Sequence, residues 1–95
     1  MKHYNITGNS TQQLFAAGSS NAIGSIWLSN VHATDAVTVD LYVEKKLTGK
    51  FYYLKSKSIA VSSFLQLENI RINGREFSLY IKLNNSDSAV DVILK

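Results

Sequence analysis

The residues from Asp35 to Lys46 alternate between apolar and polar side chains, and this pattern constrains the fold more than any other feature of the chain. Successive side chains of a β-strand point to opposite faces, so one face would carry Val37, Val39, Leu41 and Val43. A helix would scatter the same residues around its surface. The segment is therefore predicted to be a strand with one buried face.

Shorter runs of the same kind predict further strands. They are Phe77 to Leu83, Ala89 to Leu94, Ala22 to Val31, Phe51 to Lys55 and Ser63 to Glu68, with weaker candidates at Tyr4 to Thr7 and Gln12 to Phe15. Turn residues recur at intervals of roughly ten residues, as in small sandwiches and barrels. One of them, Asn73–Gly74, favours a type I′ turn.

These strands predict an all-β fold, namely a single antiparallel β-sandwich of about eight strands with jelly-roll-like or immunoglobulin-like connections. The predicted core consists of Val37, Val39, Leu41, Leu79, Ile81, Val90 and Val92. The 95 residues suffice for one domain. We expect residues 22–95 to form the sandwich. Residues 1–21 are then either an N-terminal arm or the first strands.

Composition excludes several classes of protein. The chain has no cysteine, which removes disulfide frameworks, cysteine-based zinc sites and thiol nucleophiles. Its longest unbroken apolar run, Leu14 to Ala17, falls far short of the ~18 residues of a membrane helix. No hydrophobic segment follows Met1 to Asn5, so we expect no signal peptide and no membrane partner. We expect synthesis in the cytoplasm.

Candidate residues for chemistry are sparse. His32 and Asp35 share a predicted loop, but no serine motif accompanies them. Side chains that could supply oxygen ligands to calcium lie near the last predicted turn: Asn84, Asn85, Asp87 and Asp91. No glutamate follows them to close a calcium loop as a bidentate ligand. The alternative is a polar turn whose side chains bond their own backbone. We expect no catalytic residue, no cofactor and no metal site.

Basic charge is concentrated in the Lys45–Lys57 hairpin. Five of the ten basic residues lie there, interleaved with aromatic residues: Lys45, Lys46, Lys50, Lys55 and Lys57. Two interpretations stay open. The hairpin could meet nucleic acid, glycan or an acidic protein. Alternatively, it could be an exposed edge whose lysines discourage strand addition.

Several large apolar side chains fall on strand faces opposite the predicted core. They include Trp27, Tyr42, Tyr80 and Ile93, and either Tyr52 or Tyr53. So many aromatic residues on outer faces favour contact with another subunit. The candidate interaction surface consists of Trp27, Tyr42, Lys45, Lys46, Lys50, Tyr52 and Tyr80.

The order of the segments resembles that of a known family. The chain runs from Ser25-Ile-Trp-Leu-Ser-Asn-Val31 through Ala36-Val-Thr-Val-Asp-Leu-Tyr42 to Phe51-Tyr-Tyr-Leu54. It continues with Ile59 to Leu67 and ends with Ala89-Val-Asp-Val-Ile-Leu94. This is similar to the small β-sandwich virion structural proteins of tailed bacteriophages. The resemblance covers about residues 22–95, and Ala60 stands where that family often has proline.

The resemblance implies a non-enzymatic part of a phage virion, in its capsid, neck or tail. It also implies a homo-oligomer that contacts other virion structural proteins. One alternative is a carbohydrate- or ligand-binding module in which Trp27, Tyr42 and Tyr52 stack on sugar rings. Another is a module that contacts nucleic acid through the Lys45–Lys57 hairpin.

Overall fold

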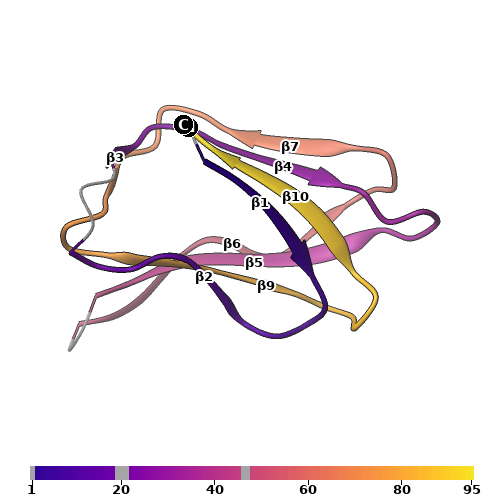
Figure 1. The fold of residues 1–95 in the computed structure, drawn as a ribbon, viewed down its shortest axis with the longest axis horizontal. Coiled ribbons are helices and arrows are strands. Elements are labelled where there is room, and N and C mark those ends of the chain that lie inside the picture. The colour runs from indigo at the N-terminus through magenta and orange to yellow at the C-terminus, as the bar shows by residue number, and fades with distance from the viewer. Residues whose placement is uncertain (1, 19–21, 46–47) are drawn as a thin grey trace.

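The computed structural model describes residues 2–18, 22–45 and 48–95, which form ten β-strands and no helix (Figure 1). The strands are β1 (Lys2–Thr7), β2 (Gln12–Phe15), β3 (Ala22–Ile23), β4 (Ile26–Asn30), β5 (Val37–Lys45), β6 (Gly49–Ile59), β7 (Phe64–Leu67), β8 (Ile72–Asn73), β9 (Ser78–Leu83) and β10 (Ala89–Leu94). Every pair of neighbouring strands is antiparallel. The predicted all-β antiparallel fold is therefore confirmed.

Two four-stranded sheets face each other and enclose the core (Figure 1). Their strand orders are β1-β10-β4-β7 and β2-β9-β5-β6. The predicted core residues are all fully buried, which confirms the predicted inward face of each strand: Val37, Val39, Leu41, Leu79, Ile81, Val90 and Val92. Alternation places these side chains between the sheets, where burial of apolar surface stabilises the fold.

The number of strands differs from the prediction. Ten strands form three sheets, because β3 and β8 pair with each other as a separate two-stranded ribbon. The segment predicted as one strand from Ala22 to Val31 is divided between β3 and β4. The division falls where the N–H groups of Gly24 and Ser25 both donate to the Lys95 carbonyl instead of continuing a ladder.

The N-terminal segment supplies an edge strand to each large sheet. β1 pairs with β10, and β2 pairs with β9. Ile6, Leu14 and Phe15 are buried in the same core as the later strands. The Tyr4 hydroxyl donates to the Leu14 carbonyl at 2.7 Å and so ties β1 to β2. The expected boundary between residues 21 and 22 falls beside residues 19–21, outside the described residues.

The edge strand β6 is twice as long as the predicted Phe51 to Lys55 segment and is irregular. Its pairing with β5 shifts register on both sides of Leu41, and Ser56 has a positive φ of 53°. Such bulges interrupt the row of unpaired backbone groups that an edge strand offers to another chain.

The turn at Asn73 differs from the predicted type I′ geometry, which needs a positive φ at its first central residue. Among described residues other than glycine, only Ser56, Ser62 and Asn69 have positive φ. The Asn73 carbonyl instead accepts hydrogen bonds from the N–H groups of Glu76 and Phe77. Its side-chain Oδ1 accepts from the Arg75 N–H at 3.0 Å, as in other Asx turns.

Candidate functional site

A row of three tyrosines crosses the outer face of the β2-β9-β5-β6 sheet. Tyr42 on β5 is directly opposite Tyr80 on β9 and directly opposite Tyr52 on β6. Tyr80 is in turn opposite Gln13 on β2, so this row crosses all four strands. Antiparallel pairing places directly opposite side chains on the same face within contact distance. We call this surface, centred on Tyr80, Tyr42 and Tyr52, the tyrosine face.

The rings of the row support one another. Tyr42 stacks on Tyr80 with ring centroids 5.3 Å apart, and its centroid is 5.0 Å from that of Tyr52. The Gln13 Nε2 donates to the Tyr80 hydroxyl at 3.2 Å. Tyr42 is consequently only 7% exposed, whereas Tyr52 is 44% exposed. Tyr52 therefore presents a large aromatic surface that its neighbours already hold in place.

Charges of both signs surround the row. The Lys50 ammonium lies 5.0 Å from the Tyr42 ring centre, and the Lys55 ammonium lies 4.7 Å from that of Tyr52. Lys55 is also 3.9 Å from the Asp40 carboxylate. Glu44 is the cross-strand partner of Lys50. The tyrosine face thus combines cation–π contacts with a mixture of acids and bases.

The basic cluster seen in the sequence is partly neutralised in three dimensions. Lys45 is 3.7 Å from Glu76 and also lies over the Phe77 ring. Lys55 is paired with Asp40, which is 15 residues away in the chain but on the neighbouring strand. Lys46, a member of the candidate surface, lies outside the described residues. Asp40 lies on β5, shortly before Lys45, whereas Glu76 precedes β9 and is 31 residues from Lys45, so the sequence around the lysines contains only the first of these two acids.

Trp27 lies on the opposite side of the sandwich from the tyrosine face. It projects outward from β4, between the inward residues Ile26 and Leu28. Its indole stacks on Phe64 of β7, with centroids 4.2 Å apart and planes 9° apart, and its N–H donates to the Ser29 hydroxyl. The candidate interaction surface is therefore divided between two faces. Phe64, which is 57% exposed, was not among the predicted residues.

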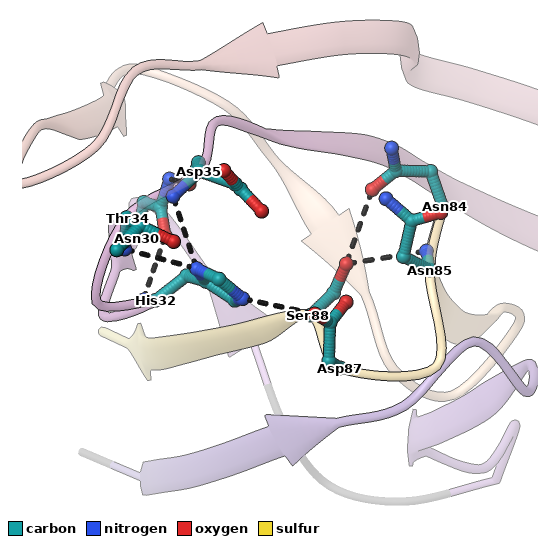
Figure 2. Close-up of polar contacts among 8 residues, drawn as sticks. All are labelled: Asn30, His32, Thr34, Asp35, Asn84, Asn85, Asp87 and Ser88. Atoms are coloured by element: carbon teal, nitrogen blue, oxygen red, sulfur yellow. Dashed lines mark hydrogen bonds and ion pairs between the residues drawn. The ribbon is translucent and has the colours of Figure 1, made fainter.

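His32 joins the β4–β5 loop to the β9–β10 turn (Figure 2). Its Nδ1 accepts hydrogen bonds from the backbone N–H groups of Thr34 and Asp35, at 3.1 and 3.0 Å. Its Nε2 lies 3.3 Å from Oδ2 of Asp87. Asp35 also reaches this cluster, in which one ligand atom each of His32, Asp35 and Asp87 lies within 4.8 Å of the others.

The hydrogen bonds of His32 determine what this cluster can do. Backbone N–H groups only donate, so Nδ1 must be the unprotonated nitrogen and Nε2 must carry the proton. A neutral histidine that ligates a metal through Nε2 needs a proton on Nδ1, where two N–H groups already point. A general base would likewise need a free Nε2 lone pair. The geometry suits a link between two loops better than a metal site or a catalytic site.

The oxygen ligands considered for calcium do not converge on one point. The Asn84 Oδ1 accepts from the Thr38 N–H and from the Ser88 hydroxyl, both at 3.1 Å. Asp91 lies on β10, where its Oδ1 accepts from the Asn5 side chain on β1. Within the turn itself, the Ser88 hydroxyl accepts from the Asn85 N–H at 3.2 Å, which fits the alternative of a polar turn whose side chains bond its own backbone.

No helix in residues 2–18, 22–45 and 48–95 has the length and apolar character needed to cross a membrane.

Fold and surface together define an antiparallel β-sandwich with an ordered aromatic outer face. No family model and no curated protein matches the chain. Among solved structures, it is similar to the crystal structure of PirA, with a TM-score of 0.60 and 12% identity over 99% of this chain and 92% of that one. It also resembles the Yersinia pseudotuberculosis-derived mitogen YPM, with a TM-score of 0.48 and 16% identity over 96% and 78%. At such identities, the likeness to PirA concerns the fold alone.

Proposed function

We propose that this protein is a non-enzymatic structural component that associates with copies of itself through the tyrosine face. We further propose that its two large sheets form a jelly roll. The eight strands of the orders β1-β10-β4-β7 and β2-β9-β5-β6 support this connectivity, with β3 and β8 as an added ribbon.

One observation carries the proposal: the cross-strand row of Tyr80, Tyr42 and Tyr52 is fixed by its own ring contacts but leaves Tyr52 exposed. Aromatic side chains held in one conformation lose little entropy on binding, and tyrosine is enriched in protein interfaces. The row is therefore prepared for contact with another protein surface.

A second copy is the partner that the charge pattern favours. In a two-fold symmetric contact the same patch meets itself, so each acid can face a base only if the patch carries both signs. The tyrosine face offers Asp40 and Glu44 beside Lys50 and Lys55. A surface that binds nucleic acid is instead dominated by uncompensated basic residues.

Backbone pairing between edge strands is a less suitable way to associate. β6 is an edge of its sheet, and it carries bulges and three lysines, Lys50, Lys55 and Lys57. These are features with which proteins prevent strand addition. The association that we propose therefore uses side chains on the sheet face.

The virion setting rests on the resemblance to small phage structural proteins. In that setting the capsid, neck or tail would supply the other partners. Mass spectrometry of purified particles from the source of this chain would locate the protein there, and its absence from such particles would remove this setting.

The proposal is tested by light scattering during size-exclusion chromatography of the full chain. Tyr52→Ser should reduce the associated fraction, because it removes the exposed member of the row. Phe64→Ser is the matched control, since Phe64 is an equally large exposed ring on the other sheet. Equal effects of both variants, or none from Tyr52→Ser, would contradict the assignment of the interface.

The two alternative functions have separate tests. Trp27 lies on the other sheet from Tyr42 and Tyr52, so one sugar ring cannot stack on all three. A glycan array would still reveal binding at either face. A nucleic-acid contact through the lysines would appear in a DNA titration as affinity that falls steeply with salt.

A further inference from the structure

A cleft lies on the side of the β5–β6 hairpin that faces away from the tyrosine face. Its volume is about 320 Å³, and it is lined by Val43, Phe51, Tyr53, Arg71, Ile72 and Phe77. The C-terminal end of β5 and the strand β3 lie at the same end of the molecule (Figure 1), and β8, the partner of β3, supplies Ile72. We call this site the aromatic cleft. The volume is at the lower end of the range for small-molecule sites.

The walls of the aromatic cleft are apolar and partly open to solvent. Phe51 pairs across the ladder with the inward residue Val43, yet Phe51 is 51% exposed. Its ring meets the Phe77 ring edge-on, with centroids 6.3 Å apart and planes at 85°. A ring on the inward face of a sheet is ordinarily covered by the core, so the exposed Phe51 ring, backed by the half-buried Phe77, offers an aromatic contact surface.

Two hydrogen-bond donors at the cleft have no partner among the described residues. Neither the Arg71 guanidinium nor the Tyr53 hydroxyl takes part in a hydrogen bond or ion pair within residues 2–18, 22–45 and 48–95. Lys45, the cation over Phe77, is already paired with Glu76. The Tyr53 hydroxyl is protonated and able to donate at neutral pH even at the ordinary pKa of 10.0, and partial burial raises that pKa further.

We propose that the aromatic cleft binds a small carboxylate that carries an aromatic ring. The ring of the ligand would pack against Phe51 and Phe77. Its carboxylate would accept hydrogen bonds from the Arg71 guanidinium, whose fork matches the two carboxylate oxygens, and from the Tyr53 hydroxyl. The apolar ring of such a ligand matches the aromatic walls of the cleft, and its anionic carboxylate matches the Arg71 guanidinium.

The test uses 3-phenylpropanoate as the probe, added to the isotope-labelled full chain and followed by two-dimensional NMR. We expect a dissociation constant of about 1 mM and shift changes at the backbone amides of the cleft residues. The neutral amide of the same acid should bind about tenfold more weakly, because it lacks the charge that Arg71 recognises.

Two variants localise the effect. Arg71→Gln should weaken binding of 3-phenylpropanoate about tenfold, which is the expected loss of one charge-assisted contact. Arg75→Gln is the matched control, since Arg75 is the other arginine of the chain, is exposed and does not line the cleft. The Arg75→Gln variant should bind 3-phenylpropanoate with the same affinity as the wild type. Both arginines are exposed, so neither change removes core packing.

Four results would overturn the proposal. The first is the absence of shift changes at ~10 mM probe, which is an order of magnitude above the expected dissociation constant. The second is shift changes confined to residues outside the cleft. The third is equal affinity for the acid and its amide, and the fourth is equal affinity of Arg71→Gln and the wild type for the acid. Association through the tyrosine face does not depend on any of these outcomes.

Discussion

Tyr42 and Tyr52 are directly opposite each other on β5 and β6, with ring centroids 5.0 Å apart and planes at 43°. The two residues nevertheless have different surroundings, because Tyr42 also has Tyr80 on its other side. Tyr42 is 7% exposed and Tyr52 is 44% exposed. One residue therefore supports the sheet, and the other is available to a partner.

This difference predicts separate effects of two substitutions. Tyr42→Ala should lower the free energy of unfolding by about 3 kcal/mol, as expected for removing a buried aromatic ring. Tyr52→Ala should cost less than about 1 kcal/mol, because much of its ring is already in water. Chemical denaturation of both variants measures the two values. Equal losses of unfolding free energy in the two variants would contradict the assignment of a supporting role to Tyr42 and an exposed, partner-binding role to Tyr52.

Substitutions in the core test the assigned inward face of β9. Leu79 and Ile81 are fully buried on β9, between β2 and β5. Leu79→Ala or Ile81→Ala should lower the free energy of unfolding by about 2–5 kcal/mol, since each leaves a cavity in a packed interior. Losses below about 0.5 kcal/mol at both positions would contradict the assigned inward face.

Alternation in the sequence was sufficient for the inward faces of the longer strands, but not for the short strands β3 and β8. Val37, Val39 and Leu41 repeat with a period of two, and this period directly reports a buried face. Cross-strand neighbours carry no such signal. The burial of Tyr42 by Tyr80 and Tyr52 depends on which strands are adjacent, and the alternation does not encode that.

The contacts that the sequence did not predict also depend on which strands are adjacent. Phe64 lies on Trp27 because β7 pairs with β4, although 37 positions separate the two residues. Arg71 lines the aromatic cleft and directly precedes the short strand β8. β8 has two residues, too few for any periodicity to be visible.

Asn30 is a buried polar residue whose contacts hold the β4–β5 loop. Its Nδ2 donates to the carbonyls of Asp35 and Ile59, and its Oδ1 accepts from the His32 N–H. Asn30→Ala should cost about 2–3 kcal/mol in thermal or chemical unfolding, because buried backbone groups lose their partners. Asn5→Ala is the control. Asn5 is exposed, and its removal should cost below about 1 kcal/mol. Similar values for both would contradict this role of Asn30.

The N-terminal strands should be required for folding. Deleting residues 1–20 removes Ile6, Leu14 and Phe15 from the core and exposes the edges of β10 and β9. We expect loss of cooperative thermal unfolding, followed by circular dichroism. A truncated chain that still unfolds cooperatively would instead favour the arm interpretation of residues 1–21.

Tyr53 should give the stability of the protein a specific dependence on alkaline pH. Burial raises its folded-state pKa above the ordinary value of 10.0. The folded state therefore holds this proton more tightly than the unfolded state. The resulting stabilisation is complete below pH 10 and declines as the pH rises through the folded-state pKa. Tyr53→Phe should remove this part of the alkaline decline, as measured by denaturation at several pH values. An identical pH profile would contradict the assignment.

Self-association through the tyrosine face is tested by sedimentation equilibrium of the wild-type chain over a wide range of concentration. The weight-average mass should rise with concentration toward twice that of one chain. Tyr52→Ser should return the mass toward the monomer, because the exposed ring of the row is lost. A wild-type mass that stays at one chain up to ~1 mM, where even weak specific contacts form, would contradict self-association through this face.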